Sequence, residues 1–424
     1  MPTGFGRLWT AQTVSSLGDG VTHAALPLIA LTLTRDPMAL AVVTAAGTLP
    51  WLFFGILGGA LVDRWDRRRT MWVADTVRAA LLALPAVAAG LDALSIPLLA
   101  IVAFLLGLGG LFFDTAATAY LPDLLTRDPA LLERANSRLR GAQTAMSGFA
   151  GPPAGSALLA LGRAVPLVAD AVSFALSALL VRTLPAMPRP APEARESLLT
   201  QARAGASHVF RNQLLLGLAL RPAVGNIAFL AVETVLALFA HDRLGIGAYG
   251  FGLLLTAEAT GGLLGAAIAS RLGRRLGTGT ALTCTAAVEG LAILGLASSS
   301  NPYAAGAALA VCGAAMGATM VLGPSLRQAI VPGQLMGRVA STSRMLAMCA
   351  APMGAFLGGW LATAYGIRTP LYAAAALLLT MTAVTASMTN NRRVEAALSA
   401  AAPADAPDRP SAGETTRACA PGPV

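Results

Sequence analysis

Apolar runs of about 20 residues recur along nearly the whole chain, and no other feature restricts the possible folds so strongly. Each run is long enough to cross a hydrocarbon core about 30 Å thick as an α-helix. A membrane β-barrel would instead show alternating segments of about ten residues. Because 55% of the residues are hydrophobic and only 12% are charged, the sequence predicts an all-α integral membrane protein.

Twelve such runs form two sets of six. The first run carries Asp19 and His23 and is too long for the core of a signal peptide, so we expect it to be retained. A proline-rich stretch that starts at Pro185 separates the two sets and favours an extended connector. The predicted spans are 8–33, 38–62, 71–91, 96–121, 141–161, 164–184, 213–240, 248–270, 277–298, 302–330, 337–363 and 368–388.

Composition divides the chain into four regions. Residues 1–184 and 212–388 are predicted to form an N-terminal and a C-terminal six-helix half. Residues 185–211 are predicted to be a cytoplasmic linker, in which apolar side chains at helical spacing indicate an amphipathic helix. Residues 389–424 are rich in alanine, proline and charged side chains, which is typical of a disordered tail.

The distribution of arginine predicts how the helices are oriented. The chain contains no lysine, and its net charge is +9. If the N-terminus is cytoplasmic, most arginines fall in cytoplasmic segments, the side that cationic loops favour. We therefore predict a multi-pass protein of the inner (cytoplasmic) membrane with both termini in the cytoplasm. This distribution also accounts for the positive charge without nucleic acid as a partner.

A short charged loop follows the second run. Gly59, Asp63, Arg64, Arg67 and Arg68 form the pattern Gly-x-x-x-Asp-Arg-x-x-Arg-Arg. This pattern resembles the loop between helices 2 and 3 of the major facilitator superfamily of transporters, which usually has glycine at the position of Asp66 here. The resemblance implies that these residues are a conformational latch, closed when the two halves meet on the cytoplasmic side.

The two halves also resemble each other in sequence. Gly162 and Pro166 recur 204 positions later as Gly366 and Pro370. A duplicated six-helix unit is a common design of secondary transporters.

Further motifs are similar to those of one subgroup of the superfamily, the secretion effectors, which includes enterobactin-exporter-like and macrolide-efflux-like proteins. The resemblance covers about residues 5–390 and implies the major facilitator fold, with twelve transmembrane helices in two pseudo-symmetric six-helix halves. The residues that carry it are Ser16-Leu17-Gly18-Asp19, Asp63-Arg64-Trp65-Asp66-Arg67-Arg68, Arg134-Ala135-Asn136-Ser137, Asp170-Ala171-Val172-Ser173-Phe174 and Gly337-Arg338-Val339-Ala340-Ser341.

The fifth run contains Gly151, Pro152 and Gly155, which resemble part of the helix-5 signature of the superfamily's antiporters. Proline there is expected to kink the helix. Pairs of glycine four residues apart also occur in the second, eighth and eleventh runs. In the superfamily these helices line the contact between the halves, so we expect the glycine stripes to lie at that contact.

Polar residues within the apolar runs are the candidates for a transport site, because charge at the bilayer centre is costly. In the superfamily, helices 1, 4, 7 and 10 line a central cavity. The resemblance therefore makes Asp19, His23, Asn226 and Glu233 candidates for contact with substrate or protons. The alternative is that Asn226 and Glu233 only form hydrogen bonds with neighbouring helices.

Asp75 and Arg78 are three residues apart and are expected to pair with each other as a structural ion pair. Asp19 is the candidate for carrying the proton, and the alternative is that it only forms a hydrogen bond with a neighbouring helix. The arginine that many drug–proton antiporters carry in helix 4 is absent from the fourth run. The coupling role then falls to Asp19, near the middle of the first run.

The resemblance implies a secondary active exporter of small amphiphilic organic molecules, such as drugs, antibiotics or siderophores, that works by alternating access and proton antiport. An uptake carrier of the same fold and a non-transporting membrane receptor or scaffold are the alternatives. The sequence has no P-loop, zinc-protease or nucleophile-elbow motif, so we expect no enzyme, cofactor or metal site. We expect the protein to be a monomer. Its expected partners are a small-molecule substrate, protons and the lipid bilayer.

Overall fold

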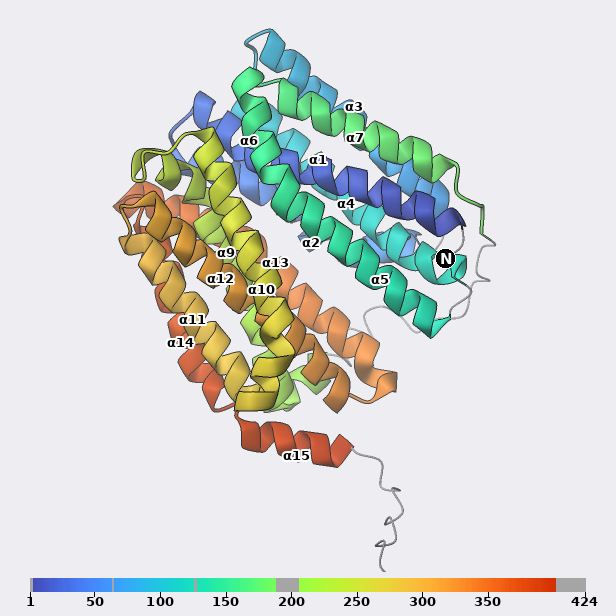
Figure 1. Ribbon diagram of the computed structural model, residues 1–424, viewed down its shortest axis with the longest axis vertical. Helices are drawn as coiled ribbons and strands as arrows, with labels where there is room; N and C mark the ends of the chain where they lie inside the picture. The colour runs from blue at the N-terminus through green and yellow to red at the C-terminus, as the bar shows by residue number, and fades with distance from the viewer. Residues whose placement is uncertain (1–2, 63–64, 126–127, 188–205, 402–424) are drawn as a thin grey trace, which may run out of the picture.

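The computed structural model describes residues 3–62, 65–125, 128–187 and 206–401, and the described secondary structure is helical throughout. Eleven of its helices are long and apolar enough to span a membrane. Figure 1 shows two bundles side by side, with the blue-to-green N-terminal half beside the yellow-to-red C-terminal half. This arrangement confirms the predicted all-α fold.

Each half contains six spans. The N-terminal half consists of α1 (Thr3–Leu33), α2 (Pro37–Val62), α3 (Arg67–Gly90), α4 (Ile96–Leu124), the fifth span formed by α5 (Pro129–Gln143), η1 (Thr144–Ala150) and α6 (Gly151–Leu161), and α7 (Val165–Arg182). The C-terminal half consists of α9 (Gln213–Asp242), α10 (Ala248–Leu276), α11 (Thr278–Ser298), α12 (Pro302–Ile330), α13 (Gly333–Tyr365) and α14 (Thr369–Ala386).

The ends of corresponding helices repeat the same local chemistry. Gly162 follows α6 with φ of +143°, and Gly366 follows α13 with φ of +95°. A side chain is disfavoured in these conformations, so glycine is the residue that can turn the chain there. Pro166 and Pro370 lie in the first turn of the helices that follow, where the missing N–H removes no intrahelical bond. The sequence repeat therefore corresponds to a structural one.

The fifth span is a continuous helix that changes its winding midway. The stretch Thr144–Ala150 is π-helical and lies immediately before Pro152 and Pro153. Because proline has no N–H, these two residues leave carbonyls of the preceding turn without their α-helical donors. The chain accommodates this with a wider turn.

The glycine pairs of the fifth, eighth and eleventh spans pack inside their own half, and this differs from the expectation that they lie between the halves. A Cβ on Gly155 would lie 2.3 Å from the Val21 carbonyl oxygen of α1. A Cβ on Gly261 would lie 1.8 Å from the Ala310 carbonyl oxygen of α12, and one on Gly354 would lie 2.3 Å from the Ile227 carbonyl oxygen of α9. These glycines therefore let neighbouring helices of one half approach closely, which makes each half a tightly packed unit.

The tail begins with a helix, which corrects the expectation of disorder directly after residue 388. Helix α15 (Asn391–Ala401) lies beneath the C-terminal half in Figure 1. The Asn391 side-chain nitrogen donates to the Leu276 carbonyl at 2.8 Å, and Val394 is buried against the core. Residues 402–424 and most of the predicted amphipathic linker lie outside the described residues, although 206–211 are helical.

We predict that Gly261→Ala destabilises the C-terminal half. The added methyl group collides with the α12 backbone, and such overpacking costs about 1–3 kcal/mol, which exceeds the helix propensity that alanine gains. The measurement is the thermal unfolding of purified protein in detergent. Gly55→Ala is the matched control, because a Cβ on Gly55 meets nothing within 4 Å. Equal melting temperatures for the two variants would contradict the packing argument.

Candidate functional site

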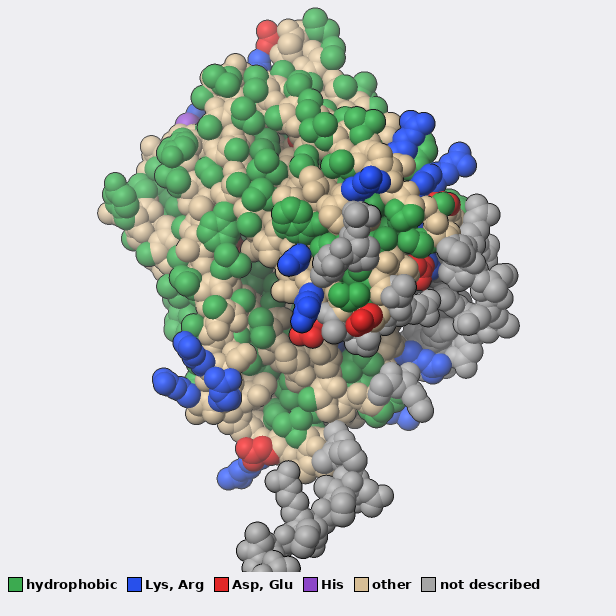
Figure 2. Space-filling view, turned by 45° about the vertical axis from the view of Figure 1, so that its right-hand side comes forward, with side chains coloured by type: hydrophobic (Ala, Val, Ile, Leu, Met, Phe, Trp, Pro, Cys, Tyr) green, Lys and Arg blue, Asp and Glu red, His purple; other side chains and the backbone are tan. Residues whose placement is uncertain are grey.

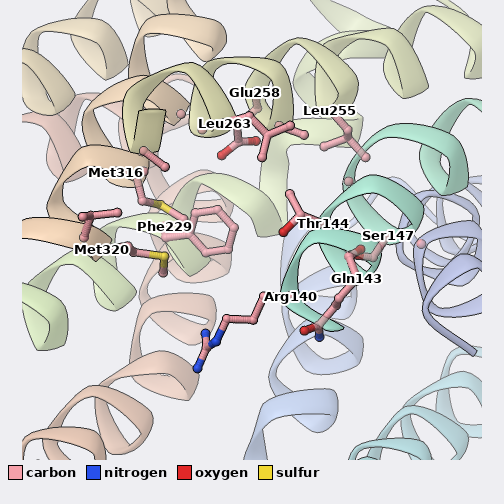
Figure 3. Close-up of a pocket in the computed structure, with 18 of the residues that line it drawn as sticks. Arg140, Gln143, Thr144, Ser147, Phe229, Leu255, Glu258, Leu263, Met316 and Met320 are labelled. Carbon is pink, nitrogen blue, oxygen red and sulfur yellow. The ribbon is translucent and has the colours of Figure 1, made fainter. Parts of the chain in front are cut away.

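A cavity of about 1010 Å³ lies between the two halves. Figure 3 shows its walls, with α5 and η1 on one side and α10 and α12 on the other. Helix 4 contributes none of the described lining residues, whereas the superfamily scheme implies helices 1, 4, 7 and 10. The lining consists of Asp19, Gly20, His23, Arg140, Gln143, Thr144, Ser147, Gly148, Pro152, Phe229, Leu255, Glu258, Ala259, Gly262, Leu263, Ala266, Gly313, Met316, Gly317, Met320, Val321, Pro324, Ser325 and Gln328.

Among the described residues, the cavity extends towards one end of the bundle. Arg140 and Gln328 of its lining lie towards the end at which α1 begins and α14 ends, which we call the terminal end. The loop between α2 and α3 lies at this end. In Figure 2, most of the visible arginine side chains gather in the lower and right-hand part of an otherwise largely apolar face.

Contacts between the halves close the opposite end, at which α1 ends and α2 begins. Ala24 and Leu28 of α1 belong to the same buried apolar cluster as Val235 of α9. A Cβ on Gly359 of α13 would lie 2.4 Å from the Ala41 Cβ of α2. The two halves therefore touch at this end and separate towards the terminal end.

Asp19 lies in the cavity wall and forms an ion pair with Arg78 of α3. Arg78 Nη2 donates to Asp19 Oδ1 at 2.6 Å, and Arg78 Nη1 lies 3.4 Å from Asp75 Oδ1. The guanidinium also stacks on the Phe174 ring of α7 at 3.7 Å from its centroid. The predicted Asp75–Arg78 pair is present, but the shorter contact of Arg78 is with Asp19. Spacing along one helix could not indicate this partner.

A further carboxyl group joins this cluster from α7. Asp170 accepts hydrogen bonds from Thr22 of α1 at 2.5 Å and from Ser173 at 3.0 Å. Gly18 makes the approach possible, because a Cβ there would lie 2.1 Å from Asp170 Oδ1. Carboxyl groups of α1, α3 and α7 thus surround a single buried guanidinium. Its one positive charge cannot balance three negative charges if all three carboxyl groups are ionised.

His23 and Glu233 connect the halves across the inner end of the cavity. His23 Nε2 of α1 lies 2.6 Å from Glu233 Oε1 of α9. Half of the His23 side chain is exposed, at 50%, whereas Glu233 is 17% exposed. Sequence reasoning selected both residues but did not pair them, because they are on different halves.

Asp19 and His23 are part of the cavity lining, whereas Asn226 and Glu233 are not. The Asn226 side-chain nitrogen donates to the Ala347 carbonyl of α13 at 2.8 Å. This is the helix-to-helix hydrogen bond that the sequence left open as the alternative. Gly151 and Gly155 likewise pack against α1, whereas Pro152 reaches the cavity wall.

Of the expected latch, Asp63 and Arg64 lie outside the described residues, and Gly59 lies near the end of α2. Arg67 bonds within its own half, to the Ala119 carbonyl at 2.9 Å and to Asp123. Arg68 donates to the Leu184 carbonyl at 2.7 Å.

The structure also explains why this chain departs from the superfamily's glycine at position 66. Asp66 is the N-cap of α3, and its carboxylate accepts the Arg69 backbone N–H at 2.8 Å. Glycine has no side chain with which to make this hydrogen bond.

Sequence reasoning missed Glu258 as a cavity residue. Its helix presents Leu255, Glu258, Ala259, Gly262 and Ala266 to the cavity. This three-to-four-residue spacing marks one helix face and was the available signal. The spacing identifies the residues that share this face of α10, but it does not indicate that the face lines the cavity.

The profile of the transmembrane secretion effector family matches residues 2–414. The chain belongs to this family. Multidrug efflux pump Tap of Mycolicibacterium fortuitum is 29% identical to it over 412 residues, which cover 91% of this chain and 96% of that protein. This secretion effector is therefore a membrane transporter rather than an enzyme.

Solved transporter structures share the fold. A bacterial homologue of the iron transporter ferroportin in its inward-facing state superposes with a TM-score of 0.75 at 17% identity, covering 92% of this chain and 100% of that one. The nucleoside transporter NupG gives a TM-score of 0.71 at 15% identity, with coverage of 92% and 100%. These likenesses confirm the major facilitator fold that the sequence predicted.

We expect Arg78→Met to destabilise this secretion effector strongly. The substitution leaves Asp75, which is fully buried, without its cation, and removing one partner of a buried ion pair costs about 3–5 kcal/mol. The measurement is thermal unfolding in detergent, compared with Arg78→Met/Asp75→Asn, in which the uncompensated carboxylate is also removed. The double variant should recover part of the loss. If Arg78→Met unfolds at the wild-type temperature, the ion pairs do not stabilise the fold.

Proposed function

We propose that this protein exports small amphiphilic organic molecules from the cell by alternating access. The observation that carries the proposal is the large cavity between the halves, open at one end and closed at the other. The likeness to a multidrug efflux pump over nearly the full length of both chains supports export rather than uptake. The largely apolar lining, interrupted by a few charged groups, suits amphiphilic cargo.

We assign the side of the membrane to which the cavity opens from the position of the arginine-rich loops. Arginine-rich loops favour the cytoplasm, so we assign the terminal end to the cytoplasmic face of the inner membrane, with both termini in the cytoplasm. The described conformation is then inward-open, and a monomer loads its substrate from the cytoplasmic side. To release it outside, the contacts at the opposite end must separate. Among these are the His23–Glu233 pair and the 3.8 Å contact between Arg35 and Asp242.

Asp19 is the residue that we propose to carry the driving proton. Its side chain is 43% exposed to the cavity while Arg78, its partner, is 9% exposed. Protonation of Asp19 removes its charge and leaves Arg78 to the carboxylate of Asp75, 3.4 Å away. The arginine thus keeps a counter-ion in either protonation state of Asp19. A proton bound when the cavity faces outwards and released when it faces inwards drives one export cycle.

The transport test uses purified protein in proteoliposomes with a pH gradient and a fluorescent amphiphile. Wild-type protein should concentrate the amphiphile against its gradient. Asp19→Asn should abolish this uphill transport while downhill exchange remains measurable, because asparagine cannot release a proton. If Asp19→Asn still concentrates the amphiphile, the proton is carried elsewhere and Glu233 is the next residue to test. If the wild-type protein moves no amphiphile in either direction, the export function itself is wrong.

The second test concerns the proposed latch on the cytoplasmic side. A carboxylate beside a helix N-terminus is stabilised by about 0.3–1 kcal/mol when exposed. We propose that Asp63 gains such a contact with α13 only when the cytoplasmic side closes. Asp63→Asn should therefore shift the population towards the inward-open state and slow export, with little change in substrate affinity in detergent. Normal export by a normally expressed variant contradicts the latch.

A further inference from the structure

One acidic side chain in the cavity forms no hydrogen bond or ion pair among the described residues. Glu258 of α10 lines the cavity, and Figure 3 shows its carboxylate directed into the open space between α10 and η1. It makes no hydrogen bond and no ion pair with any residue that the structure describes. A carboxylate in so apolar a setting is unfavourable without a cation beside it.

The other charged groups at the inner end of the cavity are paired. Asp19 is held by Arg78, and His23 is held by Glu233. Glu258 therefore remains as the carboxyl group of this region that has no ion-pair partner of its own among the described residues, because the nearby His23 is already paired with Glu233. Arg140 also lines the cavity, but Figure 3 shows it at the other end of the space, with its guanidinium pointing away from Glu258.

The walls around Glu258 are suited to the apolar part of a cation. Phe229 of α9 presents an aromatic ring to the cavity, and such rings attract cations through their negative faces. Met316 and Met320 of α12 line the same space, and their flexible thioether side chains adapt to ligands of different shape. Leu255 and Leu263 complete an apolar surface on the helix that carries Glu258.

We infer that the cavity binds lipophilic organic cations, and that the Glu258 carboxylate holds their charged centre while Phe229 and the two methionines contact their apolar groups. This inference rests on the proposed export function, for which it names the substrate class. Glu258 acts here as a specificity-determining residue. It should discriminate between molecules of the same size and shape that differ in the sign of their charge.

Tetraphenylphosphonium and tetraphenylborate form such a matched pair of probes. Binding of each to the purified full-length protein in detergent is measured by equilibrium dialysis. The wild-type protein should bind the phosphonium cation at least tenfold more tightly than the borate anion. Glu258→Gln should lower affinity for the cation at least tenfold and remove this preference, while Glu258→Asp, which keeps the charge, should retain most of it.

Glu289→Gln is the control variant. It makes the same chemical change on α11 of the same half, at a position that does not line the cavity, and should bind the cation like the wild-type protein. Thermal unfolding of each variant shows that the fold is intact. Failure of the wild-type protein to prefer the cation overturns the inference, and so does equal cation binding by Glu258→Gln. Either result leaves the export function standing if the proteoliposomes still concentrate an uncharged amphiphile, so the two failures are distinguishable.

Discussion

Charged side chains at membrane depth must find their partners inside the protein, and this constraint organises both the halves and the contact between them. Arg78 gathers the carboxyl groups of Asp19 and Asp75 and so ties α3 to α1. His23 and Glu233 satisfy each other across the boundary between the halves. In the proposed alternating access, the pair within one half can persist, whereas the pair across the boundary must break when that end opens.

The glycine stripes determine which helices pack most closely. Gly261 and Gly265 bring α10 against α12, and Gly354 and Gly358 bring α13 against α9. Backbones in such close contact cannot slide without collision, so these helices of the C-terminal half form a closely packed unit. At the closed end the two halves meet through apolar contacts, such as those of Ala24 and Leu28 with α9, together with the His23–Glu233 and Arg35–Asp242 pairs.

The fold could be predicted from the sequence because its signals are local. Apolar runs separated by arginine-rich loops indicate the helices, and Gly162 and Gly366 indicate equivalent turns in the two halves. Contacts between helices could not be predicted in the same way. The Asp19–Arg78 pair joins residues 59 positions apart, and the orientation of Glu258 depends on how α10 is rotated about its own axis. Helix α15 differs from the expected disorder because its alanine-rich sequence favours a helix and Val394 packs against the C-terminal half.

The π-helical turn at Thr144–Ala150 has a geometric consequence for the cavity. It joins α6, which is fixed against α1 by Gly151 and Gly155, to α5, which forms the cavity wall towards the terminal end. A π-helical turn holds one residue more than an α-helical turn, and each residue of an α-helix turns the chain by about 100°. Adding or losing that one residue from the wide turn would rotate the whole of α5 about its axis. The turn therefore determines that Arg140 and Gln143, rather than their neighbours, face the substrate space.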